Sequence, residues 1–379
     1  MPASALFTPS GKIELEPSRS GRTRITLRPA RQAADQFIPR PSCETSHPEE
    51  VPLFLQHGIS FNWLCEAISR IEDPEYVLRT IQRQLFAFVL PHDFIGARVL
   101  DFGSGIGGST LGLAELLPNS HVVGIDMDAN LISLGKELAA NRHLSNVEFK
   151  VSLAPDAIPR TARPFDYIML SAVLEHLLPN ERRLLMPQLW DLLKPDGVLF
   201  VNQTPHRWFP CETHSTGLWG INYLPDKLAH RYARRFSTMS PSINRSPDWN
   251  VHLRGGLRGG SERELIRRLT AGGRAPAIIL QPVAGGLRDR ADYWLSCTSP
   301  RHRSLKKAIG WLFRITDHLF ATIPAVNLDV AVRKGCKGAR ERSLRQKAAD
   351  FRRSATRESR NTRFVPWRSR FAVNKSLIG

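Results

Sequence analysis

The sequence predicts an α/β fold with a doubly wound, mostly parallel seven-stranded sheet and helices on both faces. Three observations lead to this fold class. Short apolar runs alternate with helical patterns between residues 98 and 236. A glycine-rich turn joins the first of these runs to a helix, and two further apolar runs follow at 277–282 and 327–333.

The predicted elements follow from periodicity along the chain. Helical spacing begins at 61–71 and continues at 76–88, where Val77, Ile81, Leu85 and Val89 share one face. We expect these two helices to cover a ligand pocket. The first five strands are predicted at 98–101, 121–126, 147–151, 167–171 and 198–202. The later helices are predicted at 109–117, 129–141, 180–193, 224–236 and 261–269.

Composition divides the 379 residues into three parts. Residues 1–50 are rich in Pro, Ser and Arg, so we expect a disordered extension, although residues 12–27 could pair as a hairpin. Residues 51–333 form the predicted domain, with a helical cover at its start and an insertion loop at 202–225. Residues 334–379 form a basic tail that we also expect to be disordered. The formal net charge is +18, and the segment from Arg333 onward holds 15 basic and 3 acidic residues.

The run from Arg98 to Gly108, with the sequence RVLDFGSGIGG, is the most informative motif. Glycines at 103, 105 and 107 allow a tight turn that a nucleotide can approach closely. Gly103, Gly105 and Gly108 also satisfy the dinucleotide-binding spacing, which alone is a weak signal.

Two acids bear on the choice of ligand. Asp101, at the mouth of the turn, would repel a pyrophosphate but attract an ammonium group, and S-adenosylmethionine carries an ammonium group and no phosphate. Asp126 ends the second predicted strand and can accept both ribose hydroxyl protons, as an acid does in dinucleotide sites. Asp126 therefore suits either ligand, whereas Asp101 favours S-adenosylmethionine.

These motifs resemble those of the class I S-adenosylmethionine-dependent methyltransferases. Their acid-x-Gly-x-Gly-x-Gly motif corresponds to residues 101–107, and their second motif to 124–128. The run 165–177 resembles their fourth strand and its turn, and 192–201 their fifth strand. The resemblance spans about residues 55–333 and implies a Rossmann-like fold.

The resemblance also implies a cofactor site for S-adenosylmethionine. Its expected residues are Asp101, Gly103, Gly105, Gly107, Asp126, Met127, Ala154 and Ser171. One position departs from the family, because Leu153 stands where many members carry an acid near the adenine. Backbone and apolar contacts around Leu153 and Ala154 would then hold the adenine, and Asp156 could take the place of the missing acid.

Candidates for the chemistry gather after the fourth and fifth strands. Methyl transfer needs an oriented nucleophile and often a base, and His176, His206 and His214 lie in suitable segments. We take His214, Glu212 and His176 as the catalytic candidates, since a carboxylate two residues from a histidine can orient its ring. The alternative is that these residues shape turns and pin the loop. Glu212 and His214 could also bind a metal, but spacing places no third ligand, so no metal is expected.

The loop at 202–225 also resembles one in bacterial methyltransferases associated with cell-surface glycan or lipid-linked sugar pathways. The shared pattern is Thr-Pro-x-Arg-Trp, then Glu-x-His, then Leu-Pro, here within residues 204–225. The expected acceptor is therefore an oxygen of a small-molecule, sugar or lipid-linked substrate.

Two other functions remain open, an RNA methyltransferase anchored by the basic tail and a non-catalytic cofactor-binding scaffold. The turn after the fourth strand reads Leu-Ser-Ala-Val, unlike the Asn/Asp-Pro-Pro-aromatic motif of base-amino methyltransferases. The tail interleaves Arg with aromatic residues, so it could contact RNA or an anionic membrane.

The cysteines and the apolar runs bear on location. Five scattered cysteines without a Cys-x-x-Cys pair favour a reducing compartment, and no disulfide partner is expected. No run is long and apolar enough for a signal peptide or a membrane span, and Trp311–Val326 suits an amphipathic helix. We expect a cytoplasmic protein, with peripheral membrane association left open.

Overall fold

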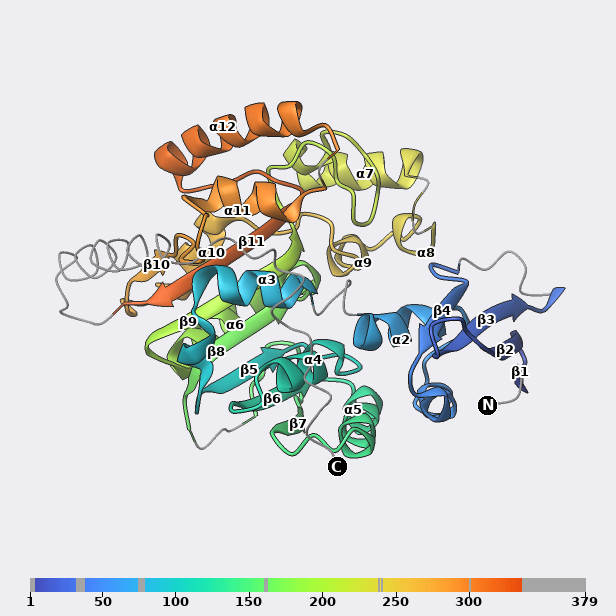
Figure 1. The fold of residues 1–379 in the computed structure, drawn as a ribbon. Coiled ribbons are helices and arrows are strands. Elements are labelled where there is room, and N and C mark those ends of the chain that lie inside the picture. Colours follow the sequence, from blue (N-terminus) through green and yellow to red (C-terminus); the bar gives the residue numbers. More distant parts are fainter. Residues whose placement is uncertain are drawn as a thin grey trace. The chain divides into compact units, whose positions relative to one another are not determined.

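A seven-stranded sheet forms the centre of the computed structural model (Figure 1). The structure describes residues 4–31, 38–73, 79–159, 163–237, 239, 241–299 and 301–335. The chain divides into two units after Gly335, and the second unit, which holds all of the predicted basic tail except Lys334 and Gly335, lies outside the described residues. The strands of the sheet are β5 (Arg98–Phe102), β6 (His121–Asp126), β7 (Val147–Val151), β8 (Phe165–Ser171), β9 (Leu193–Pro205), β10 (Ala277–Ile279) and β11 (Asn327–Lys334).

The strand order is β10-β11-β9-β8-β5-β6-β7. Strand β11 is antiparallel to both of its neighbours, whereas β5 to β9 pair in parallel. The chain moves outward from β5 to β7 and then returns to place β8 on the other side of β5. The order therefore reverses between β5 and β8, and ligands of such sheets bind at the carboxyl ends of the strands there.

Helices cover both faces of this sheet, which confirms the doubly wound α/β fold class. The α-helices of the described residues are α1 (Val51–Gln56), α2 (Leu64–Glu72), α3 (Arg79–Phe88), α4 (Gly108–Leu116), α5 (Ala129–Asn141), α6 (Pro179–Leu192), α7 (Asp226–Phe236), α8 (Pro241–Asn244), α9 (Trp249–Arg254), α10 (Glu262–Leu269), α11 (Arg290–Cys297) and α12 (Arg303–Phe320). Alternate residues of one strand serve opposite faces. Leu100 joins a core with α6 and α10, whereas Val99 joins a core with α3, α4 and α11.

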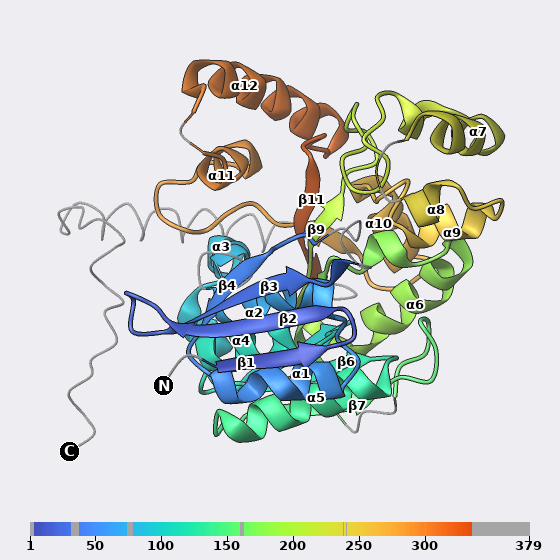
Figure 2. The same cartoon turned by 90° about the vertical axis from the view of Figure 1, so that its right-hand side faces the viewer.

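The N-terminal segment corrects one sequence prediction. Residues 4–31 and 38–45 are not a disordered extension, because they form an antiparallel sheet of β1 (Ser4–Thr8), β2 (Gly11–Pro17), β3 (Thr23–Pro29) and β4 (Ser42–Thr45), seen face-on in Figure 2. Ile13 pairs with Leu27 and Leu15 with Ile25, and all four side chains are buried against α1 and α2. The short apolar alternation, set among Arg, Ser and Pro, is sufficient for a sheet because two helices cover it. The hairpin considered for residues 12–27 is present.

The two early helices differ in what they cover. Helix α2 packs against α4, where a Cβ at Gly108 would lie 3.3 Å from the Arg70 carbonyl oxygen. Helix α3 instead buries Ile81, Leu85 and Phe88 on one face of the seven-stranded sheet. Both early helices therefore contact α4, and α2 lies beside its first residue, directly after the glycine-rich turn.

Candidate active site

The glycine-rich turn follows β5 directly at the point where the strand order reverses. Gly103, Gly105 and Gly107 all have positive φ, at 79°, 52° and 87°. A Cβ on Gly103 would lie 2.4 Å from Val173 Cγ2, so this glycine lets the turn pass the segment after β8. A Cβ on Gly105 would meet no atom within 4 Å, so the turn faces open space there.

Asp101 lies buried beneath this turn. Its Oδ2 accepts hydrogen bonds from the hydroxyls of Ser109 and Thr110, both at 2.6 Å. Burial raises the pKa of the Asp101 carboxyl and the charge of Asp126 adds to this, although the two hydroxyls act in the opposite direction. Its Oδ1 is buried without a hydrogen-bond partner among the described residues. A buried carboxylate oxygen without a donor fits a site that receives a cationic group.

Asp126 ties the next loop to the turn. The backbone N–H groups of Gly105 and Asp128 donate to its two carboxylate oxygens at 2.8 and 3.0 Å. The side chain remains partly exposed, and each oxygen keeps a lone pair that a hydroxyl could use. Its carbonyl oxygen accepts from Ser152 N at 2.7 Å, so the ends of β6 and β7 are joined.

The remaining expected cofactor residues lie around these acids. Met127 and Leu153 are exposed, with Leu153 at 96%, and Ala154 is half-buried while its carbonyl oxygen accepts from the Ser152 hydroxyl. Ser171 ends β8 and pairs in register with Asn202 of β9. The structure thus brings all eight expected cofactor residues to the carboxyl ends of β5 to β8.

Backbone strain marks the residue after β8 and a neighbouring position within β9. Ala172 and Gln203 have φ values of 54° and 57°, which non-glycine residues adopt rarely. The side-chain amide nitrogen and oxygen of the fully buried Asn202 both lack a hydrogen-bond partner within the described part of the chain. Asn202 was not among the residues predicted for the site, although its place at the end of the fifth predicted strand was the available signal.

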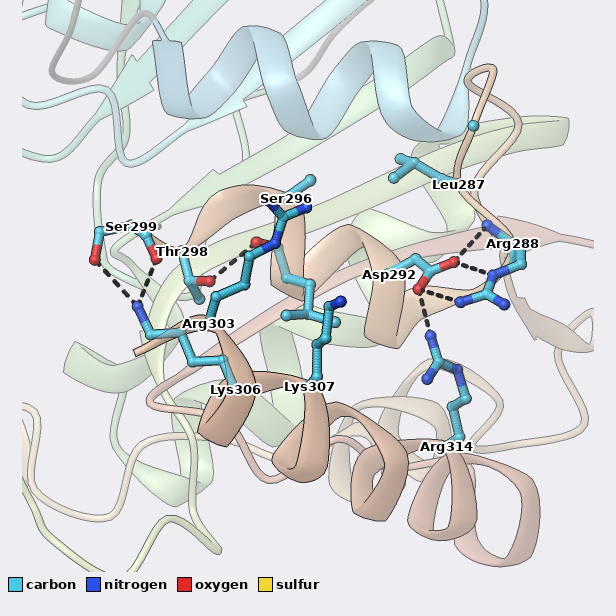
Figure 3. Close-up of a pocket in the computed structure, with 12 residues that line it drawn as sticks. Leu287, Arg288, Asp292, Ser296, Thr298, Ser299, Arg303, Lys306, Lys307 and Arg314 are labelled. Carbon is cyan, nitrogen blue, oxygen red and sulfur yellow. Dashed lines mark hydrogen bonds and ion pairs between the residues drawn. The ribbon is translucent and has the colours of Figure 1, made fainter. Parts of the chain in front are cut away.

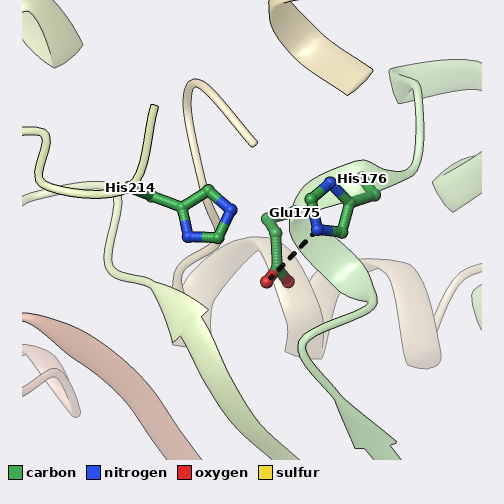
Figure 4. A group of neighbouring side chains, drawn as sticks. All are labelled: Glu175, His176 and His214. Atoms are coloured by element: carbon green, nitrogen blue, oxygen red, sulfur yellow. Dashed lines mark ion pairs between the residues drawn. The ribbon is translucent and has the colours of Figure 1, made fainter. Parts of the chain in front are cut away.

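His176 and His214 come together although 38 positions separate them. Their ring centroids are 5.5 Å apart (Figure 4). Glu175 joins them, because one ligand atom from each of the three side chains lies within 4.8 Å of the others. Glu175 is buried in the 3-10 turn Leu174–His176 after β8, His176 is half-buried and His214 is exposed. We call Glu175, His176 and His214 the Glu-His-His cluster.

Glu212 does not orient the His214 ring, contrary to the sequence interpretation. Its buried carboxylate accepts hydrogen bonds from the backbone N–H groups of His214, Ser215 and Thr216, and from the hydroxyls of Ser215 and Thr216. These bonds hold residues 212–216 in a tight loop. Glu212 therefore places the backbone that carries His214.

His206 also has a structural role. Its ring is buried, its Nδ1 accepts from Trp208 N at 3.0 Å, and its Nε2 donates to Glu262 at 3.0 Å. Burial alone would raise the pKa of Glu262, but the hydrogen bond from His206 and the charge of Arg290 lower it to about 2. This network anchors the start of the loop after β9 to α10 and α11.

A separate cavity of about 690 Å³ lies between α11 and α12 (Figure 3). Its basic lining residues are Arg288, Arg303, Lys306, Lys307 and Arg314. Arg288 and Arg314 both pair with Asp292, and Lys306 donates to the Ser299 carbonyl oxygen. This cavity is distinct from the Glu-His-His cluster and carries an excess of positive charge.

Comparisons with known proteins agree with the motifs. Residues 94–222 match the family model described as "Methyltransferase domain". The chain is 31% identical over 149 residues to trans-aconitate 2-methyltransferase of Variovorax paradoxus, which covers 39% of this chain and 52% of that protein. It is 32% identical over 114 residues to (S)-coclaurine N-methyltransferase of Thalictrum flavum, covering 30% of each.

Among solved structures, PKMT2 from Rickettsia typhi in complex with AdoHcy aligns with a TM-score of 0.38 at 20% identity, covering 70% of this chain and 53% of that one. The chain spans about half or less of the length of these curated relatives. The match of residues 94–222 to the methyltransferase domain model bears out the family expected from the motifs.

Proposed function

We propose that this methyltransferase domain binds S-adenosylmethionine and transfers its methyl group to an oxygen of a small-molecule, sugar or lipid-linked acceptor. Asp101, the turn glycines and Asp126, with Met127, Ala154 and Ser171 around them, form the cofactor side. The Glu-His-His cluster forms the acceptor side. When bound, the cofactor supplies a methyl group activated on a sulfonium.

One observation carries the proposal, the close approach of the two sides at Val173. Gly103 of the turn admits the Val173 side chain, and Val173 lies two residues before Glu175. The Glu-His-His cluster therefore begins two residues after the side chain that contacts the glycine-rich turn. Such proximity is what an in-line displacement between two bound molecules requires.

His176 and His214 are the catalytic residues of the proposal. The His176 Nδ1 lies 2.6 Å from the Arg254 carbonyl oxygen, and a carbonyl only accepts, so Nδ1 carries the proton. Nε2 of a neutral ring is then left with a free lone pair. It can accept the hydrogen bond of an acceptor hydroxyl and orient its oxygen, while that hydroxyl loses its proton as the new C–O bond forms.

The first experiment measures cofactor binding by calorimetry. Asp101→Asn and Asp126→Asn are expected to weaken S-adenosylmethionine binding at least tenfold. Asp166→Asn is the matched control, because Asp166 lies at the start of β8 and pairs with Lys194. Unchanged affinity in both of the first two variants would overturn the proposed cofactor site.

The acceptor is sought with labelled S-adenosylmethionine and separate lipid, glycan, small-molecule and RNA fractions. Label in the first three fractions, released as an O-methyl product, supports the proposal. Label in RNA would favour the alternative in which the basic tail anchors RNA. Cofactor binding without label in any fraction would favour a non-catalytic scaffold.

Helix α12 favours the lipid-linked form of the acceptor. It exposes six large apolar side chains, Leu305, Trp311, Leu312, Ile315, Leu319 and Phe320. The basic cavity borders the same helix, and its Arg303 and Lys307 form no ion pair with the described residues. Exposed apolar residues beside cations are typical of helices that lie at an anionic bilayer surface. Helices α12 and α7 also lie at the same end of the described unit in both views (Figures 1 and 2).

We therefore propose that α12 binds an anionic bilayer. Among the described helices, none has the length and apolar character to cross one. The full chain is expected to float with phosphatidylglycerol vesicles, and the double variant Trp311→Ser, Leu319→Ser to lose this binding. Trp63→Ser is the control, since Trp63 is also exposed but lies at the start of α2. Equal flotation of the double variant and the control would contradict the role of α12.

A further inference from the structure

The Glu-His-His cluster has the composition and spacing of a metal-binding site. One carboxylate oxygen and two imidazole nitrogens lie within 4.8 Å of one another (Figure 4). The three residues come from two segments of chain, the turn after β8 and the loop after β9. The sequence offered only Glu212 and His214 as a pair, whereas the folded chain replaces Glu212 by Glu175 and adds His176.

Glu175 is the strongest sign that a ligand belongs in the cluster. Its side chain is fully buried, and its Oε2 accepts from the Thr204 hydroxyl at 2.8 Å. Its Oε1 is buried without a hydrogen bond from the described residues, and His176 Nε2 lies 3.9 Å from it. A buried carboxylate oxygen that faces two imidazoles without a donor is suited to a cation.

The two histidines are held as metal ligands usually are. The Arg254 carbonyl oxygen fixes the tautomer of His176 and leaves Nε2 directed toward Glu175. Gly256 makes room for the other ring, because a Cβ there would lie 2.4 Å from His214 Cδ2. His214 is exposed, so the cluster is open on one side.

We infer that Glu175, His176 and His214 bind one divalent cation of the zinc or manganese class. Two imidazoles and one carboxylate are a common ligand set for such ions when further positions stay open for water or substrate. The open position would take the acceptor oxygen.

The role of the ion rests on the proposed function, whereas its binding does not. A bound cation lowers the pKa of a coordinated hydroxyl. The hydroxyl proton then leaves to solvent, the oxygen forms the bond to the methyl carbon, and the carbon–sulfur bond breaks with its electron pair on sulfur. His176 and His214 would act as ligands in this step, and Thr204 would be a positioning residue that orients Glu175.

The test titrates chelator-treated full-length protein with Co²⁺ and follows its ligand-field absorption, then displaces Co²⁺ with Zn²⁺. One Co²⁺ per chain is expected. His176→Ala, His214→Ala and Glu175→Gln are each expected to weaken binding at least 100-fold, and Thr204→Val by 10- to 100-fold. Thermal unfolding of each variant checks that it folds.

His230→Ala is the matched control. His230 and His252 form another close imidazole pair, with ring centroids 4.7 Å apart, but both ring Nε2 atoms lie near the Ser246 carbonyl oxygen. Co²⁺ binding that is absent, or equal in all folded variants and the control, would overturn the metal site.

Activity separates this inference from the proposed function. If methyl transfer is complete in the presence of chelator but is lost in His176→Ala and His214→Ala, the role of the ion is refuted. The histidines would then act as hydrogen-bond acceptors, as in the proposed function. Metal binding in a chain that does not bind S-adenosylmethionine would refute only the proposed function.

Discussion

The cofactor side and the acceptor side of the candidate site are built differently. The contacts of the cofactor side span short stretches of sequence, because Asp101 contacts Ser109 and Thr110, and Asp126 contacts Asp128 and, 21 positions away, Gly105. The acceptor side joins distant segments, such as His176 with Arg254 and Glu175 with Thr204. A short motif can therefore specify where the cofactor lies, whereas the acceptor pocket depends on how separate loops pack.

The largest predicted effect is on the loop of the acceptor side. Glu212→Ala would leave three backbone N–H groups and two hydroxyls of residues 214–216 without their acceptor. We expect the loop to lose about 4 kcal/mol of local stability and methyl transfer to fall by more than tenfold, with unchanged S-adenosylmethionine affinity. Hydrogen exchange of residues 206–220 measures the first effect and calorimetry the last.

The isosteric variant separates structure from chemistry. Glu212→Gln keeps one oxygen acceptor and should retain part of the exchange protection and a matching part of the activity. Activity lost in Glu212→Gln with native protection of the loop would instead make Glu212 a participant in the reaction.

The same contrast explains what the sequence could predict. Strand alternation and the glycine motif predicted the seven-stranded sheet and the place of Asp101 and Asp126, because each depends on residues within a few positions. The hydrogen-bond partners of Asp101 were not predictable, since the hydroxyls of Ser109 and Thr110 reach its carboxylate only after α4 forms. Glu212 was misinterpreted because two-residue spacing to His214 does not reveal that backbone amides take up its oxygens. Of the N-terminal sheet only the hairpin at 12–27 was considered, and disorder was preferred, because Ile13 and Ile25 become a core only when α2 covers them.

The next prediction is that the contributions of two carboxyls to folding stability, those of Glu262 and Asp101, change in opposite directions as the pH falls. The pKa of Glu262, which anchors the loop through His206, is lowered to about 2 in the folded chain. The unfolded value is higher, so Glu262 contributes stability at neutral pH, about 3 kcal/mol, which is lost as pH falls from about 4 to 2. The pKa of Asp101 is raised by burial, so its contribution is present in acid and is lost as pH rises.

Urea unfolding between pH 7 and pH 3 measures both contributions. Glu262→Gln is expected to lower the midpoint at pH 7 and to lose less stability on acidification than the native chain. Asp101→Asn is expected to unfold at the same or a higher urea concentration at pH 7. If the urea midpoints of all three proteins changed equally between pH 7 and pH 3, neither carboxyl would contribute to stability in the predicted way.

The smallest effect on stability is expected at the turn itself, and it tests whether open space at Gly105 is ligand space. Gly105 and Gly96 both have positive φ, and a Cβ on either would meet no atom within 4 Å. Gly105→Ala and Gly96→Ala should therefore each cost about 1 kcal/mol of unfolding free energy from backbone strain. Only Gly105→Ala should also weaken S-adenosylmethionine binding, by tenfold or more, because its methyl group occupies the face of the turn beside Asp126. Equal stability losses and equal S-adenosylmethionine affinities in the two variants would contradict the proposal that the cofactor binds at this turn.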